Sequence, residues 1–121
     1  MGAINERHKQ TIARFLTIVD ENPAHRLRMT EVYRVLGVPS RTLSTLTHRH
    51  LNASPLQYIT QRRMAFVRQT LQSGHCEYVK DAAAQFGFFE LGQFSVRYRR
   101  LYGETPSTTL RRHRAEAEPS P

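Results

Sequence analysis

Two glycines fifty positions apart, Gly37 and Gly87, mark a repeated pattern that limits the folds open to this chain. Each glycine follows a short segment with helical spacing of apolar residues and precedes a longer one. Each longer segment ends just before a Ser/Thr-Pro dipeptide, Ser54-Pro55 or Thr105-Pro106. Glycine suits the left-handed backbone of a tight turn between helices. Short helix, glycine turn and longer helix is the pattern of a helix-turn-helix, and two copies of it are much harder to obtain by chance than one.

Apolar residues recur at helical spacing through most of the chain, which predicts an all-α fold with seven helices. The predicted segments lie at about 6–21, 26–36, 40–51, 54–73, 78–86, 88–103 and 105–113. Pro23 disfavours extension of the first helix, Ser40 can cap the third, and the Ser54-Pro55 and Thr105-Pro106 pairs combine a cap with a first-turn proline. Residues 116–121 are predicted to form a disordered tail. A chain of 121 residues is expected to form one compact unit.

The spacing also predicts which side chains are buried. Aromatic residues at every fourth position of the sixth helix share one face, which is typical of core anchors: Phe94, Tyr98 and Tyr102. The third helix is predicted to bury Leu43, Leu46 and Thr47, and to leave a polar, basic face outside. The long fourth segment is predicted to bury one stripe composed of Leu56, Ile59, Phe66, Val67 and Leu71.

The charge of the chain indicates a polyanionic partner. Lysine and arginine total 18 against 10 acidic residues, which gives a net charge of +8. Between Glu31 and Glu77 no acidic residue occurs, and residues 97–114 contain six arginines against Glu104 alone. Nucleic acid is therefore the leading expectation, although a ribosome-associated protein or a membrane-surface binder fits the composition as well. No apolar run approaches the length of a membrane span and no signal peptide is recognisable, so we expect a cytoplasmic protein.

The reactive side chains do not form a pattern typical of an enzyme or a metal site. The single cysteine, Cys76, excludes an internal disulfide, and it lies in a polar stretch where a loop thiol is expected. The six histidines do not recur at metal-binding spacing beside cysteine or carboxylate. No glycine-rich phosphate loop occurs. We therefore expect no enzymatic activity, no metal and no cofactor.

The chain resembles the C-terminal DNA-binding region of AraC/XylS-family bacterial transcriptional regulators. The resemblance covers about residues 8–113 and is most specific between Gly87 and Pro106. It is carried by Ser40-Arg41-Thr42-Leu43, Ser54-Pro55, Tyr58, Arg62-Arg63-Met64, Val79, Ala83, Gly87-Phe88, Phe94-Ser95, Tyr98, Gly103 and Thr105-Pro106. It implies a seven-helix domain over residues 1–115, in which two helix-turn-helix subdomains, at about 27–51 and 78–102, are joined by a linker helix at about 54–73. It also implies sequence-specific control of transcription.

The resemblance further implies two sets of base-contacting positions. They are Arg41, Ser44 and Thr45 in the third helix, and Leu91, Gly92, Gln93 and Val96 in the sixth. The second set departs from polar readout, since glycine has no side chain and Leu91 and Val96 cannot form hydrogen bonds. This helix is expected to contact thymine methyl groups, to respond to DNA shape, or mainly to hold the backbone. The first copy departs from the second at two positions, where Tyr33 stands opposite Ala83 and Asn52 stands opposite Gly103. These differences affect the expected angle between the helices of the first motif.

A mechanism follows for double-stranded DNA. Arginines on one surface release counterions from phosphates, and the expected phosphate contacts are Arg49, Arg62, Arg97 and Arg100. Arg41, near a helix start, is the expected bidentate guanine contact, and Gln93 the expected base contact of the sixth helix. The linker helix, about 28 Å long, would let both second helices reach major-groove segments about 34 Å apart. One monomer should then occupy an asymmetric site.

The main alternative is a protein-interaction module that docks on RNA polymerase or on a sensor domain and does not itself contact bases. Helices two and five carry Glu31 and Asp81 beside exposed positions, which would suit such docking. RNA polymerase is also a further expected partner of a DNA-bound activator. RNA binding is a third option, but aromatic residues outside the predicted core do not form a stacking platform. We expect the chain to be a DNA-binding domain only, without an effector-binding domain.

Overall fold

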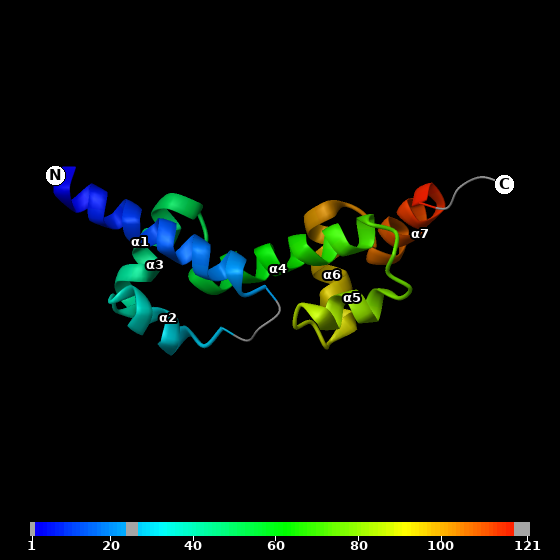
Figure 1. Ribbon diagram of the computed structural model, residues 1–121, viewed down its shortest axis with the longest axis horizontal. Coiled ribbons are helices and arrows are strands. Elements are labelled where there is room, and N and C mark those ends of the chain that lie inside the picture. The colour runs from blue at the N-terminus through cyan, green and yellow to red at the C-terminus, as the bar shows by residue number, and fades with distance from the viewer. Residues whose placement is uncertain (1, 24–26, 118–121) are drawn as a thin grey trace. The chain divides into compact units, whose positions relative to one another are not determined.

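The computed structural model describes residues 2–23 and 27–117. The described part contains seven helices and no strand (Figure 1). The helices are α1 (Gly2–Glu21), α2 (Met29–Leu36), α3 (Ser40–Leu51), α4 (Pro55–Gln72), α5 (Val79–Gln85), α6 (Leu91–Tyr102) and α7 (Pro106–Ala117). The all-α, seven-helix prediction is therefore confirmed. None of the helices within the described residues is long and apolar enough to span a membrane.

The chain forms two compact units, and the division between them falls within α4, between Arg62 and Arg63. The first unit has a core built from Phe15, Val19, Val32, Leu36, Leu43 and Ile59. The core of the second unit contains Met64, Val67, Leu71, Ala82, Ala83, Phe86, Phe94, Tyr98 and Leu110. The expectation of one compact unit is wrong, because the apolar face of α4 is shared between two cores: Ile59 belongs to the first, and Met64 and those after it to the second. Two subdomains joined by a linker helix describe this arrangement.

The turns that define the repeat have the predicted backbone. Gly37 has a φ of 70° and Gly87 a φ of 89°, both in the region that glycine adopts without steric cost. Asn52 ends α3 with a φ of 56°, and Gly103 ends α6 with a φ of 75°. Asparagine is the residue that best replaces glycine in this conformation. The replacement of glycine by Asn52 in the first copy therefore leaves the end of α3 in the same left-handed backbone conformation as the end of α6.

Asn52 gives a direct test of this turn. Asn52→Ala should destabilise the first unit by about 1–2 kcal/mol, because alanine pays the full left-handed penalty, whereas Asn52→Gly should change stability by less than about 0.5 kcal/mol. Urea unfolding measures both. Gly103→Ala is the matched comparison at the equivalent position of the second unit. An added Cβ there would meet no atom within 4 Å, so any loss of stability comes from the left-handed backbone alone. An Asn52→Ala variant as stable as the parent would contradict the left-handed conformation of Asn52.

Helix capping agrees with prediction at two of three positions. Ser54 and Gln57 form a reciprocal capping box, in which the Gln57 amide donates to Ser54 Oγ at 3.1 Å and the Ser54 amide donates to Gln57 Oε1 at 2.9 Å. At α7 the Thr108 amide donates to Thr105 Oγ1 at 3.2 Å. The predicted cap at Ser40 is wrong, because the Pro39 carbonyl already accepts from Leu43 and Ser40 is the first residue inside α3, with no side-chain cap.

Several boundaries and two positions predicted to be buried differ from prediction. Leu56 is 62% exposed although the adjacent Pro55 is buried, and Phe66 is half-buried. The sixth helix begins at Leu91 instead of residue 88, since the residues after Gly87 complete the turn. The seventh helix continues past residue 113 to Ala117, because Ala115, Glu116 and Ala117 are favourable helix formers. The predicted tail at 116–121 is thus helical at its start, and residues 118–121 lie outside the described part of the chain.

Candidate nucleic-acid interface

Helix α3 buries one face and exposes the residues expected to contact bases. Leu43, Leu46 and Thr47 are buried, as predicted. Arg41 and Thr45 are exposed and Ser44 is half-buried. The predicted base contacts of the first motif therefore share the outward side of one helix, from which acidic side chains are absent.

The polar side chains of α3 are partly held by the helix itself. Thr45 Oγ1 donates to the Arg41 carbonyl at 3.0 Å, so its hydroxyl proton is engaged and its oxygen can still accept. His48 Nδ1 lies 2.8 Å from the Ser44 carbonyl, a geometry that requires this nitrogen to carry the proton. In the neutral ring, Nε2 is then an acceptor on the exposed surface. The guanidinium of Arg41 is thus the strongest hydrogen-bond donor among the three predicted base contacts.

A groove of about 260 Å³ lies beside this helix in the first unit. It is lined by side chains of α2, α3 and the start of α4: Met29, Tyr33, Ser40, Arg41, Ser44, Ser54, Pro55 and Leu56. Two of the predicted base contacts, Arg41 and Ser44, therefore border an indentation that also contains Tyr33 and the exposed Leu56. Helical spacing predicts that Leu56 is buried, whereas the structure places it at this groove. No feature of the sequence predicted the groove.

Helix α6 packs through its aromatic face. Phe94 and Tyr98 are fully buried, with ring centroids 5.8 Å apart, and Tyr102 follows at 4.8 Å from Tyr98. This confirms Phe94 and Tyr98 as core anchors of the second motif, and the half-buried Tyr102 packs against the same core. The predicted base-contacting positions Leu91, Gly92, Gln93 and Val96 are all exposed. Three of these four positions, Leu91, Gly92 and Val96, have no polar side chain, in contrast to the predicted positions of α3.

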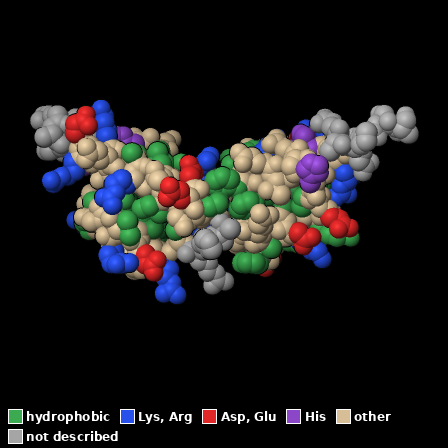
Figure 2. All heavy atoms as spheres, viewed as in Figure 1, with side chains coloured by type: hydrophobic (Ala, Val, Ile, Leu, Met, Phe, Trp, Pro, Cys, Tyr) green, Lys and Arg blue, Asp and Glu red, His purple; other side chains and the backbone are tan. Residues whose placement is uncertain are grey.

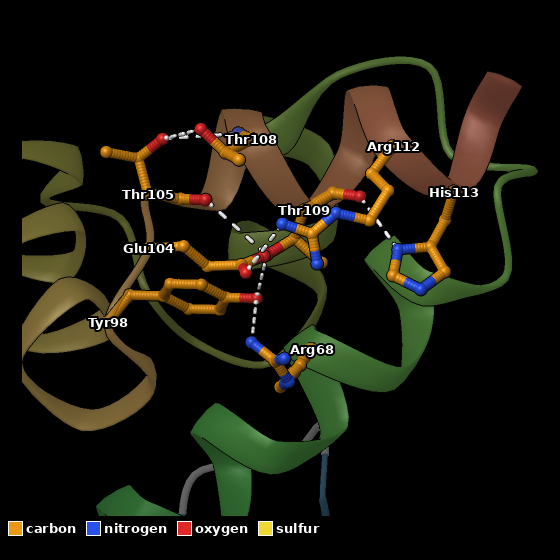
Figure 3. Close-up of polar contacts among 8 residues, drawn as sticks. All are labelled: Arg68, Tyr98, Glu104, Thr105, Thr108, Thr109, Arg112 and His113. Atoms are coloured by element: carbon orange, nitrogen blue, oxygen red, sulfur yellow. Dashed lines mark hydrogen bonds and ion pairs between the residues drawn. The ribbon is translucent and has the colours of Figure 1, made fainter.

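A chain of hydrogen bonds ties α6 to α4 and α7 (Figure 3). Arg68 Nη1 donates to the Tyr98 hydroxyl at 3.1 Å, and that hydroxyl donates to Thr109 Oγ1 at 2.7 Å. Thr109 in turn donates to the Glu104 carboxylate, which also accepts from Arg112 Nη2 at 3.0 Å. Arginine can only donate and an ionised carboxylate can only accept, so these end groups determine which way the Tyr98 and Thr109 hydroxyl protons point along the network. Because Tyr98 and Thr109 are buried, these bonds hold the recognition helix in one orientation.

The carboxylate of this network should make the second unit acid-sensitive. The hydrogen bond from Thr109, with further bonding from Arg112, lowers the pKa of Glu104 below its ordinary value of 4.5. A carboxyl with a lowered folded-state pKa adds stability above its unfolded pKa, and this stability is lost as the pH falls through the lower folded value. The urea midpoint should therefore drop below a pH of about 4.5, and Glu104→Gln should flatten that drop. The control Glu90→Gln removes an exposed carboxylate outside the network and should keep the parental acid response. An unchanged response in Glu104→Gln would contradict the prediction.

Three of the four arginines predicted to contact phosphate are exposed: Arg49, Arg97 and Arg100. The fourth, Arg62, is half-buried, and its Nε lies 3.0 Å from Asp20 Oδ1 of α1. This ion pair joins positions 42 residues apart, so no local pattern of the sequence could have revealed it. A phosphate contact by Arg62 would compete with Asp20.

Comparison with known proteins places this architecture in a family. Residues 32–112, more than half of the chain, match a family profile described as a helix-turn-helix domain. A solved structure described as a probable AraC family transcriptional regulator from Rhodopseudomonas palustris CGA009 aligns with a TM-score of 0.81. Its sequence is 26% identical, and the alignment covers 86% of this chain and 97% of that one. The chain belongs to the AraC/XylS family.

Curated relatives of this AraC/XylS-family chain are considerably longer. A Pseudomonas putida protein named XylDLEGF operon transcriptional activator 1 is 30% identical over 103 residues, which span 84% of this chain and 31% of the relative. XylDLEGF operon transcriptional activator 2 of the same species is 28% identical, and the match spans 66% of its length. The chain thus covers between about a third and two thirds of these relatives. A regulator structure from Chromobacterium violaceum, 22% identical with a TM-score of 0.81, has the same fold over 93% of this chain and 96% of its own.

Proposed function

We propose that this AraC/XylS-family chain binds double-stranded DNA sequence-specifically and thereby regulates bacterial transcription in the cytoplasm. The observation that carries the proposal is the pair of helix-turn-helix units, each with an exposed, arginine-bearing second helix that lacks acidic residues. The names of the relatives favour activation of transcription, with RNA polymerase as a second partner. Helices α2 and α5, which carry the exposed Glu31 and Asp81, are proposed to contact such a partner.

In the proposed complex, base contacts supply sequence specificity and phosphate contacts supply affinity that does not depend on sequence. Arg41 donates two hydrogen bonds to guanine O6 and N7, while Ser44 and Thr45 contact neighbouring base edges from the same helix. On α6, Gln93 is the side chain able to form a bidentate pair, with adenine as its partner. Arg49, Arg97 and Arg100, joined by Arg62 when it leaves Asp20, supply the affinity that does not depend on sequence.

Each recognition helix is proposed to enter a separate major-groove segment. Helix α4 has 18 residues and at 1.5 Å per residue is about 27 Å long, which approaches the spacing of about 34 Å between successive major-groove segments. The two units differ in their outward side chains, so the proposed site is asymmetric and is occupied by one monomer.

The proposal is tested by selecting bound sequences from a random DNA pool and titrating the selected site in gel-shift assays. The expected site is asymmetric, is bound at one chain per duplex, and is bound at least about 10³-fold more tightly than random DNA. Four neutralised phosphates should give a slope of log K against log salt of about −3.6. Exclusive binding of two chains to a palindrome would contradict the monomeric mode. Protein pull-downs that resist nuclease and high salt, together with no DNA preference, would favour the interaction-module alternative.

A further inference from the structure

The outward surface of α6 includes apolar side chains among its charged ones, where that of α3 is polar. Leu91 is 39% exposed and Val96 is 54% exposed, and both are among the positions expected to contact bases. Val96 follows Gly92 by four residues and precedes Arg100 by four, so these three lie along one stripe. Hydrophobic side chains interrupt the charged ones over the visible face of the molecule as well (Figure 2). An exposed apolar group next to a basic one would suit a ligand that offers both negative charge and apolar surface.

Phe89 extends this apolar surface at the start of the helix. Its neighbour Phe88 packs against Phe94 with ring centroids 5.1 Å apart, and the Phe88 amide donates to the Ala83 carbonyl at 2.9 Å. Phe88 is half-buried against the core of the second unit, whereas the next residue, Phe89, is exposed. With Phe88 anchored in the core, Phe89 is directed outward and is 70% exposed. Phe89 is thus the most exposed large hydrophobic side chain among those described.

Gly92 allows this apolar surface to come close to a ligand. An added Cβ would lie 3.7 Å from Glu90 Oε1, an ordinary contact, so the packing of the protein itself does not require glycine here. Glycine in a helix costs about 1 kcal/mol relative to alanine. The missing side chain leaves room for close approach of the first turn of α6, and Gln93 lies next to that opening.

We propose that the second unit recognises thymine through its C5-methyl group, with Phe89, Leu91 and Val96 as the contacting side chains. This inference rests on the proposed DNA-binding function and specifies what its second half-site contains. The thymine methyl is the only apolar group that the base pairs present in the major groove. An A·T pair also offers adenine N6 and N7 to Gln93, so hydrogen bonding and methyl contact select the same pair. Arg97 and Arg100 contact the flanking phosphates.

The test replaces thymine with deoxyuridine, which keeps base pairing and removes only the methyl group. Each thymine of the selected site is replaced singly, and the affinity is measured by gel shift. A methyl contact is worth about 0.8 kcal/mol per group buried, so each contacted thymine should cost about fourfold in affinity when its methyl is removed. In Phe89→Ala, Leu91→Ala and Val96→Ala proteins the thymine contacted by the missing side chain should no longer respond.

Leu101→Ala is the matched control, because Leu101 is a 47% exposed residue of the same helix outside the stripe of Gly92, Val96 and Arg100. This variant should keep the full response to deoxyuridine. All four substitutions affect exposed side chains, so folding should be preserved, which circular dichroism checks. Specific binding with no thymine sensitive to methyl removal would overturn the inference while leaving the proposed function intact. Sensitivity to every methyl that persists in Phe89→Ala, Leu91→Ala and Val96→Ala alike would overturn it as well. Absence of sequence-specific binding would overturn both proposals.

Discussion

Replacing Phe94 with alanine is expected to destabilise the second unit by about 3–5 kcal/mol, through lost apolar burial and the cavity that remains. Phe94 is 1% exposed and contacts Phe88 and Tyr98 through ring centroids 5.1 Å and 5.8 Å away. Small domains have a total stability of about 5–15 kcal/mol, and a unit of this size lies near the lower end. The variant should therefore be close to unfolding in its second unit, and α6 should lose its fixed orientation.

Urea unfolding followed by circular dichroism measures this loss, and the two cores predict that it is confined to one unit. The first unit, whose core includes Phe15 and Leu43, should keep the parental transition. Leu101→Ala is again the control, since an exposed surface substitution usually changes stability by no more than about 0.5 kcal/mol. A Phe94→Ala loss below about 1 kcal/mol would contradict the assignment of Phe94 as the core anchor of α6.

The repeat carried most of the information about the fold. Gly37 and Gly87 both adopt positive φ, and the aromatic residues at 94, 98 and 102 pack inward as their spacing predicted. These features depend on local geometry, which periodicity and turn chemistry describe well. The number of helices and the two helix-turn-helix units followed from them.

Predictions failed where the outcome depended on contacts that are distant in sequence. The stripe of α4 gives no sign that its residues belong to two separate cores. Its spacing also predicts a buried Leu56, which is 62% exposed. The ion pair of Arg62 with Asp20 and the network from Arg68 to Glu104 also join different helices. Spacing along one helix carries no information about such partners.

The base-contacting positions of the candidate interface stay a prediction, and what the structure adds is their exposure. All seven positions expected to contact bases lie on α3 or α6, and each of them is at least partly exposed. Their exposure agrees with the proposed role but does not assign a base to any of them. The structure adds Phe89, which the repeat pattern did not single out, because its outward direction depends on how Phe88 is anchored. The division into a polar and an apolar recognition surface follows from these side chains together.

Arg41→Ala is expected to weaken binding to the selected DNA site by about 1–3 kcal/mol, or about 5- to 150-fold, with little effect on random DNA. Arg41 is exposed at the start of α3, where the N-terminal residues of a recognition helix contact base edges. Its planar guanidinium matches guanine O6 and N7, a geometry that lysine cannot reproduce, so Arg41→Lys should recover little of the loss. Gel-shift titrations on the selected site, on a site with that guanine replaced, and on random DNA measure the effect.

Arg97→Ala provides the contrasting variant, because it removes an exposed arginine of α6 that is proposed to contact phosphate alone. It should weaken both DNAs by a similar factor and reduce the salt slope by about 0.9, whereas Arg41→Ala should leave that slope nearly unchanged. The Arg41→Ala protein should also lose its preference for guanine at one position and tolerate the replaced site as well as the original. Equal losses on specific and random DNA would show that Arg41 acts through phosphate, and base recognition by α3 would then depend on Ser44 and Thr45.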